Sequence, residues 1–249
     1  MYSFKIKLAN KVIQVNAIYK TTLNYCKDYL CDSSDVDFEV SVCEGDLDYE
    51  KQKSEKELSA EELAHLKVNY YELTAVYRKI AEKLVDYNIF LFHGSCLAVD
   101  GEAFIFTAKS GTGKSTHARL WRERFGDRCV MINDDKPLIE VTDSGVTVWG
   151  TPWNGKHRLG TNTSAPLSAI CILERAEENS IRRQSLLAVF PTVFSQTYRF
   201  ADPDKMRKTL VLLETAMNRV GLYRLGCNMD SSAADVSYNG MKGNNTNEA

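Results

Sequence analysis

The sequence predicts an α/β fold, in which a mixed sheet with flanking helices follows a small α+β part at the N-terminus. Three observations predict it. Apolar runs of strand length alternate with helix-like segments over residues 89–230. A glycine-rich loop joins one of these runs to a helix-like segment at residues 108–116. Residues 1–88 combine alternating strand patterns with one long helical pattern, so they are expected to fold as a separate part.

The composition is that of an ordinary globular protein and excludes several functional classes. Hydrophobic residues make up 44% of the 249 and charged residues 26%, with a formal net charge of −2. Without a basic field, nucleic acid is not an expected partner. No apolar run approaches the ~20 residues that span a bilayer, and the first residues lack a signal-peptide core. We therefore expect a cytoplasmic protein with no membrane partner.

The first 58 residues are expected to contain a hairpin and one further strand. Residues 2–8 and 12–18 alternate between apolar and polar around a short turn, and residues 36–42 alternate likewise. Residues 23–30 have the character of a short helix. The charged run at residues 44–58 is typical of a solvent loop or a poorly ordered arm.

A long helix is expected next. Ser59 and Glu62 have the spacing of a capping box, which predicts a helix from there to about Val85. An apolar stripe follows it at spacings of three and four: Leu63, Leu66, Tyr70, Leu73, Tyr77, Ile80 and Leu84. Such a stripe is typical of packing against a sheet, and a seam between copies in a homo-oligomer is the alternative.

From residue 89 on, strand-like runs dominate the sequence. Two of them, at residues 89–99 and 102–107, flank Asp100-Gly101, a dipeptide typical of a hairpin turn. Further strands are expected at residues 129–132, 136–141, 146–149, 169–173 and 222–225, the last of them at a sheet edge.

Two helices and a tail complete the prediction. Residues 203–219 are expected to form a helix, and residues 185–197 a helix that Pro191 kinks or breaks. The end of the chain is rich in glycine and asparagine, so residues 231–249 are expected to be a disordered tail.

Residues 108–116 (AKSGTGKST) have the layout of a phosphate-binding loop between a strand and a helix. Gly111 and Gly113 permit the backbone conformations that turn successive N–H groups toward phosphate oxygens. Lys114 is expected to reach the β- and γ-phosphates, and the Ser115 hydroxyl to bind Mg²⁺. The nucleotide-binding residues expected from this pattern are Ala108, Lys109, Ser110, Gly111, Thr112, Gly113, Lys114, Ser115 and Thr116. The plainer alternative is a Gly/Ser connection without a ligand.

Two adjacent carboxylates follow the apolar strand 129–132. Asp134 and Asp135 resemble the acidic element that accompanies phosphate-binding loops: one carboxylate holds Mg²⁺ and the other accepts a proton from an attacking hydroxyl. Neighbouring carboxylates ordinarily raise the pKa of one member, which suits a base. The alternative is that one aspartate only caps the next turn. We assign Mg²⁺ to Ser115 with Asp134 and the proton to Asp135, although the sequence leaves the two carboxylate roles interchangeable.

The order of several motifs resembles a known family. His93-Gly94, Asp100-Gly101, the SGTGKS loop, the segment 125–128 and Asp134-Asp135 follow one another over residues 90–175. This order resembles the catalytic core of bacterial HPr kinase/phosphorylase and of the group it forms with ATP-type phosphoenolpyruvate carboxykinase. Thr116 stands where HPr kinases carry an acidic residue.

The resemblance implies a kinase-like core at residues 89–230 that uses ATP and Mg²⁺. It implies that Lys114 and Ser115 handle phosphates and metal, that Asp134 and Asp135 share metal binding and proton abstraction, and that His93 supports the acidic pair. By itself, a histidine within an apolar strand is more often a packing residue.

A basic loop follows the predicted strand 146–149. Residues 150–160 read GTPWNGKHRLG, and Lys156 or Arg158 is the candidate for neutralising charge in the transition state or for holding an anionic acceptor. Trp153 is expected to stack on a base or to pack beneath the loop. The alternative is a solvated surface loop.

The sequence therefore predicts an ATP- and Mg²⁺-dependent phosphotransferase acting on a hydroxyl, most plausibly a serine that is free or part of a peptide or protein. A non-catalytic ATP-binding regulator, a peptide-maturation partner that binds a peptide along strand 36–42, and a carboxykinase-like lyase are the alternatives. The acceptor, the nucleotide preference and the oligomeric state stay open.

Overall fold

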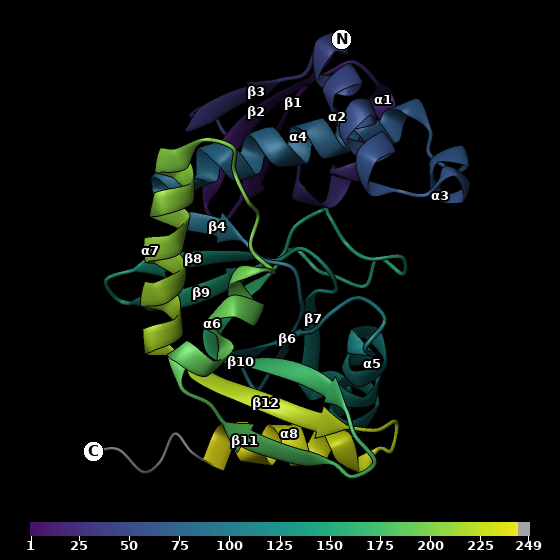
Figure 1. Cartoon of the computed structure of the whole chain (residues 1–249). Coiled ribbons are helices and arrows are strands. Elements are labelled where there is room, and N and C mark those ends of the chain that lie inside the picture. Colours follow the sequence, from purple (N-terminus) through teal and green to yellow (C-terminus); the bar gives the residue numbers. More distant parts are fainter. Residues whose placement is uncertain (244–249) are drawn as a thin grey trace. The chain divides into compact units, whose positions relative to one another are not determined.

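The computed structural model describes residues 1–243, and the chain forms two compact units that divide between Tyr87 and Asn88 (Figure 1). In the first unit, strands β1 (Tyr2–Leu8) and β2 (Lys11–Ala17) form the predicted antiparallel hairpin, and β3 (Phe38–Ser41) pairs with β2 in parallel. The helices of this unit are α1 (Lys20–Tyr25), α2 (Glu44–Glu57), α3 (Ala60–Ala64) and α4 (Val68–Leu84), with short 3₁₀ turns at Lys27–Tyr29 and Val85–Tyr87.

Helix α2 corrects the expectation of a loop or arm at residues 44–58. The segment lacks an apolar stripe, and ion pairs hold it instead: Arg78 of α4 lies 2.6 Å from Glu50 and 3.3 Å from Asp46. At its start, the backbone N–H of Cys43 donates to Asp46 at 3.0 Å. Because hydrophobic periodicity does not register ion pairs to another helix, the sequence pattern gave no sign of α2.

The capping box at Ser59 is confirmed, but the helix it begins is short. Ser59 N donates to the Glu62 carboxylate at 2.8 Å, and Glu62 N donates back to Ser59 Oγ at 3.3 Å. This helix, α3, ends at Ala64, and α4 begins separately at Val68, so the continuous helix to Val85 was wrong.

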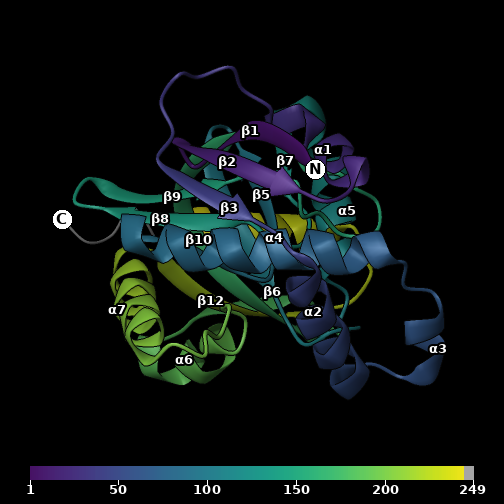
Figure 2. The ribbon, with the colours of Figure 1, turned by 90° about the horizontal axis from the view of Figure 1, so that it is seen from above.

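The buried face of α4 differs from the predicted stripe. Tyr70 is exposed, whereas Glu72 is fully buried and accepts hydrogen bonds from Ile18 N, Tyr19 N and the Thr22 hydroxyl. Because the buried Glu72 carboxylate must face these donors, the buried face of α4 is turned away from the one that the apolar stripe predicts. Figure 2 shows α4 lying along the three-stranded sheet.

The second unit is built on a nine-stranded mixed sheet in the order β4-β8-β9-β10-β6-β5-β7, with β12 beside β10 and β11 beside β12. Its strands are β4 (Ile89–Leu91), β5 (Ser95–Val99), β6 (Glu102–Thr107), β7 (Cys129–Asn133), β8 (Leu138–Thr142), β9 (Gly145–Trp149), β10 (Ser164–Arg175), β11 (Ser180–Arg183) and β12 (Gly221–Cys227). Its helices are α5 (Lys114–Phe125), α6 (Leu186–Phe194), α7 (Pro203–Arg219) and α8 (Ser232–Gly243), with a 3₁₀ turn at Gly126–Arg128.

Helices cover both faces of the central strands (Figure 1). Ile105 of β6 packs in a core cluster with α6 and α7, whereas its neighbours Phe104 and Phe106 pack in a second cluster with α5 and α8. Successive side chains of a strand point to opposite faces, so β6 is buried on both. This two-layer cover confirms the mixed sheet with flanking helices.

Several local predictions in this unit are confirmed. The β5–β6 hairpin turns at Asp100 (φ 53°) and Gly101 (φ 85°), the two positive φ values of a type I′ turn. Helix α7 has the predicted bounds and is capped by Asp202, which accepts from Asp204 N at 2.8 Å. The helix expected at 185–197 is α6, and Pro191 lies inside it without the break that was one of the two expected effects.

Two predictions at the end of the chain are wrong. Residues 222–225 belong to β12, which lies between β10 and β11 rather than at an edge. The expected disordered tail at 231–249 contains α8, which buries Ala233 against α5 and whose Ser237 accepts a 2.8 Å hydrogen bond from Trp121 Nε1. The few apolar contacts of α8 are with distant parts of the chain, so a composition rich in glycine and asparagine does not reveal them. Residues 244–249 lie outside the described residues.

Across residues 1–243, no helix combines the length and the apolar character that crossing a membrane requires.

Candidate functional site

The glycine-rich loop connects β6 to α5 with the backbone that a phosphate cradle needs. Gly111 has a φ of 76° and Gly113 a φ of 124°, values that side-chain-bearing residues adopt only with strain. Ala108, which stands where glycine is usual, has no positive φ and is buried. Alanine at this position therefore brings no backbone strain.

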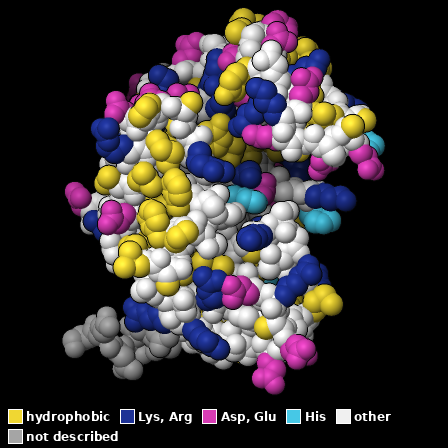
Figure 3. Space-filling view, in the orientation of Figure 1, with side chains coloured by type: hydrophobic (Ala, Val, Ile, Leu, Met, Phe, Trp, Pro, Cys, Tyr) yellow, Lys and Arg dark blue, Asp and Glu magenta, His cyan; other side chains and the backbone are white. Residues whose placement is uncertain are grey.

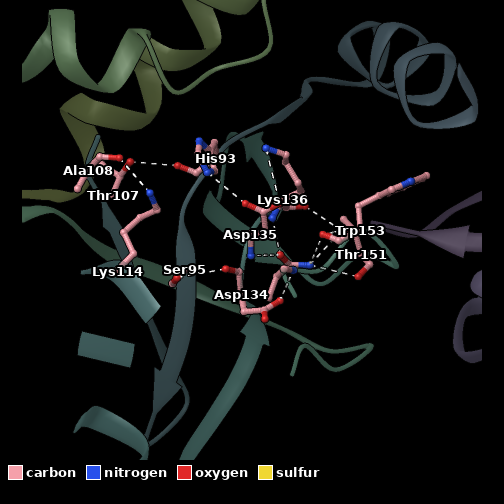
Figure 4. Close-up of polar contacts among 12 residues, drawn as sticks. His93, Ser95, Thr107, Ala108, Lys114, Asp134, Asp135, Lys136, Thr151 and Trp153 are labelled. Atoms are coloured by element: carbon pink, nitrogen blue, oxygen red, sulfur yellow. Dashed lines mark hydrogen bonds and ion pairs between the residues drawn. The ribbon is translucent and has the colours of Figure 1, made fainter. Parts of the chain in front are cut away.

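Lys114 lies at the start of α5 and folds back across the loop. Its Nζ donates to the Ala108 carbonyl at 3.0 Å (Figure 4). Burial lowers the pKa of Lys114, with Lys136 acting in the same direction and the negative charge of Asp135 opposing it. The ammonium is thus placed over the loop and within electrostatic reach of the acidic pair.

Asn133 shapes the turn that carries the two aspartates. It is the last residue of β7 and fully buried, and its Nδ2 donates to the Thr151 carbonyl at 3.1 Å. Its Oδ1 accepts from the backbone N–H groups of Asp135 at 2.8 Å and Lys136 at 2.5 Å. One amide side chain therefore ties the acidic turn to the start of the basic loop.

Asp135 is the member of the pair that faces cations. Its Oδ1 lies 3.1 Å from His93 Nε2, and its Oδ2 lies 3.7 Å from Lys136 Nζ (Figure 4). Burial acts to raise the pKa of Asp135, but the hydrogen bond from His93 and the charges of Lys136 and Lys114 outweigh it, and the pKa is lowered. This corrects the expectation that pairing raises the pKa of one carboxyl.

Asp134 points to different partners. Its Oδ1 accepts a hydrogen bond from Gly155 N at 2.7 Å, and its backbone carbonyl accepts from Ser95 Oγ at 3.2 Å. The adjacent carboxylates thus contact different groups, Asp134 the basic loop and Asp135 the imidazole. The two side chains therefore have separate sets of partners.

The His93-Gly94 segment lies across the end of β6, next to the glycine-rich loop. Thr107 Oγ1 donates to the His93 carbonyl at 3.0 Å, and Gly94 N donates to the Asp135 carbonyl at 3.0 Å. A Cβ on Gly94 would lie 3.0 Å from both Ile105 Cγ2 and the Phe106 carbonyl. Close packing against β6 therefore favours glycine here and fixes the position of His93.

The loop at residues 150–160 is anchored at both ends and exposed in the middle. Trp153 is buried, so it packs beneath the loop and does not offer a face to a base. Gly160 N donates to Asn154 Oδ1 at 3.0 Å, which closes the loop. Lys156, His157 and Arg158 are exposed at its tip.

Two cavities flank the glycine-rich loop. One of about 700 Å³ is lined by Ser115, Asp134 and Lys156, among others, and one of about 530 Å³ by Gly111 and Arg175, among others. Thr116 lines both. Figure 3 shows Lys, Arg and His side chains exposed on the face that it draws. Arg158, unlike Lys156, is not among the residues that line the first cavity.

The structure brings together most of the site residues expected from the sequence. Lys114, His93 and Asp135 form one group, and Ser115, Asp134 and Lys156 line one cavity. Within residues 1–243, no group of three or more His, Cys, Asp or Glu side chains is placed to hold a metal ion. Mg²⁺ usually takes one or two protein ligands and completes its shell with phosphate oxygens and water, and Ser115 with Asp134 fit that donor set.

Sequence reasoning missed several residues that position the site. They are Asn133, Ser95, Thr107, Lys136 and Arg175, whose Nη2 donates to the Gly111 carbonyl at 2.6 Å. For Asn133 a signal was present, because asparagine directly before a polar turn often bonds the backbone two residues on. For Ser95, Thr107 and Arg175 the partner lies far away in the sequence, whereas Lys136 directly follows its partner Asp135.

Comparison with known proteins finds a distant structural likeness. No family model matches the chain, and no curated protein matches it in sequence. Among solved structures, it is similar to the Hpr(Ser) kinase/phosphatase from Coxiella burnetii, with a TM-score of 0.36 and 9% identity over 62% of this chain and 98% of that one. The likeness is distant, so the function proposed below is inferred from the residues of the site.

Proposed function

We propose that the second unit is an ATP- and Mg²⁺-dependent kinase that transfers the γ-phosphoryl group to a hydroxyl, that of a serine in free form or in a peptide or protein. The observation that carries the proposal is the position of Asp135, held by His93 at 3.1 Å beside a glycine-rich loop across which Lys114 folds. A cradle for phosphates and a fixed proton acceptor are the two parts that phosphoryl transfer needs from a protein.

The glycine-rich loop would bind the phosphates. Its backbone N–H groups and the N-terminus of α5 offer partial positive charge, and Lys114 exchanges the Ala108 carbonyl for a phosphate oxygen. Ser115 and Asp134 would hold Mg²⁺, which would supply neutralisation of the phosphate charge.

Asp135 would accept the proton. The acceptor oxygen attacks the γ-phosphorus, a new O–P bond forms, the bond to the β–γ bridging oxygen breaks, and ADP leaves. The hydroxyl proton passes to the Asp135 carboxylate.

Lys156 is the stronger candidate for stabilising charge on the transferring group. It lines the same cavity as Ser115 and Asp134, and the tip of its loop is joined to Asp134 through Gly155 N. Arg158 lies two residues farther along the loop, and its backbone is in the left-handed region, with a φ of 49°.

The test separates binding from chemistry. We expect Lys114→Ala to weaken ATP binding ~10-fold or more and Asp135→Asn to retain ATP binding but lose ~100-fold or more of the turnover. Calorimetry gives the ATP affinity, and ADP release with a panel of serine-containing compounds gives the turnover. Unchanged ATP affinity in Lys114→Ala would refute the cradle. ATP binding without turnover in the wild type would favour a regulator instead.

A further inference from the structure

The larger cavity has a basic wall of which the kinase chemistry described above uses only Lys156. It is bounded by the first turns of α5 and by the loop 150–160. Ser115, Arg119 and Arg122 follow one another at i, i+4 and i+7, so they share one face of α5. Lys156 and His157 form the opposite side.

The cations of this wall are poorly neutralised within the protein. Among residues 1–243, the side chains of Arg122, Lys156 and His157 form no ion pair and no hydrogen bond, and Arg119 pairs only with the exposed Glu123 of its own helix, at 2.7 Å. Asp134 is the one carboxylate lining the cavity in the described part of the chain, and its Oδ1 is engaged by Gly155 N. The cavity therefore has an excess of positive charge.

The nucleotide does not account for this charge. Its phosphates would occupy the glycine-rich loop, and the second cavity is lined by Gly111 and Thr112 but not by Asp134. The nucleoside would extend there, because the γ-phosphate must end near the acidic turn. The basic wall lines the same cavity as Ser115 and Asp134, and Asp134 is the chain neighbour of the proposed proton acceptor Asp135.

We propose that this cavity is the acceptor pocket and that it takes a small hydroxy compound with a carboxylate or phosphate group, held by Arg119 and Arg122. The proposal rests on the proposed function. A guanidinium binds either anion through two parallel hydrogen bonds, and both arginines lie on the helix that begins with the phosphate-handling residues. The cavity volume of about 700 Å³ is in the range of small-molecule sites.

The experiment compares acceptors that differ only in charge. L-Serine is paired with L-serinamide, and glycerol 3-phosphate with glycerol; the first pair tests for a carboxylate and the second for a phosphate. In the wild type with saturating ADP and Mg²⁺, we expect one anionic member to bind at least ~10-fold more tightly than its neutral partner by calorimetry. Equal or undetectable binding of both members in both pairs would overturn the proposal.

Variants then locate the bound anion. Arg122→Gln should weaken binding of the favoured anion ~10-fold while ADP affinity stays within ~2-fold. Arg124→Gln is the matched control, because Arg124 lies on the same helix, pairs with Asp235 at 2.8 Å and does not line the cavity. Equal effects of the two variants would overturn the assignment. Anion binding lost in Lys114→Ala but kept in Arg122→Gln would place the anion in the glycine-rich loop and overturn it as well.

Turnover separates this proposal from the proposed function. If the anionic compound binds and depends on Arg122 but no acceptor is phosphorylated, the kinase proposal fails and the anion pocket stands. If phosphotransfer occurs only to a serine within a peptide, the kinase proposal stands and the small-molecule pocket is refuted. If the favoured anion is phosphorylated and Arg122→Gln raises its KM with ATP KM unchanged, both are supported.

Discussion

His93 Nε2 lies 3.1 Å from Asp135 Oδ1 and joins the segment before β5 to the turn after β7. His93 is itself held through its backbone, whose N–H donates to the Gln196 carbonyl at 2.8 Å and whose carbonyl accepts from Thr107. The imidazole is therefore placed by three different parts of the second unit. Through this bond it helps to keep Asp135 ionised.

Replacing His93 should raise the pKa of Asp135, since the hydrogen bond and charge of His93 lower it. In His93→Ala we expect the acid limb of the kcat/KM profile to move to higher pH, because the carboxylate is then protonated sooner as the pH falls. Carboxyl carbon NMR titration of Asp135 gives the same shift independently. Lys136→Gln should shift the pKa of Asp135 in the same direction but by less, because the contact of Lys136 with Asp135 is longer, at 3.7 Å. An unmoved titration in His93→Ala would contradict this role.

Asn133→Ala should destabilise the second unit by about 2–4 kcal/mol, because it leaves the N–H groups of Asp135 and Lys136 without their acceptor and removes one of the two amide donors to the Thr151 carbonyl. Urea unfolding measures the loss. Asn133→Asp keeps the acceptor but not the donor, so the acidic turn should stay better ordered than in the alanine variant. A loss below about 0.5 kcal/mol in Asn133→Ala would show that water replaces these bonds.

Gly160→Ala should distort the basic loop, because an added Cβ would lie 2.0 Å from Asn154 Oδ1 and 3.1 Å from Asn133 Cα. We expect a loss of about 1–3 kcal/mol in thermal or urea unfolding, together with reduced turnover. Gly155→Ala is the graded comparison, since its Cβ would meet Asp134 Oδ2 at 3.2 Å. The prediction fails if Gly155→Ala destabilises the protein more than Gly160→Ala does.

His117 should make stability depend on pH. Burial lowers its pKa from 6.5 to about 4. Between these values the unfolded chain binds a proton that the folded one does not, so stability is fully present above pH 6.5 and falls as the pH decreases toward 4, by up to ~1.4 kcal/mol per pH unit.

The matched variant is His117→Gln, which keeps an amide group in place of the imidazole Nε2 that lies 3.2 Å from Ser237 Oγ. Urea unfolding at several pH values between 4 and 7 should show a shallower slope for this variant than for the wild type. Parallel slopes would mean that His117 is protonated as readily in the folded state as in the unfolded one.

The sequence by itself determined the elements whose cause is local. The β5–β6 turn follows from Asp100-Gly101, the start of α7 from Asp202, and the glycine-rich loop from Gly111 and Gly113. In each case the deciding contact or backbone angle lies within four residues of the side chain that requires it, so the pattern is visible along the chain.

Tertiary structure decided what depends on distant partners. Ion pairs to Arg78 hold helix α2 in place, the buried Glu72 decides which face of α4 is buried, and α8 packs against α5. In the site, the local motifs predicted the loop and the two aspartates, but only the folded sheet brings His93 to Asp135, and only the packing around α5 sets Arg122 opposite Lys156. Burial and long-range charge decide which residues pair, and neither produces a periodic pattern in the sequence.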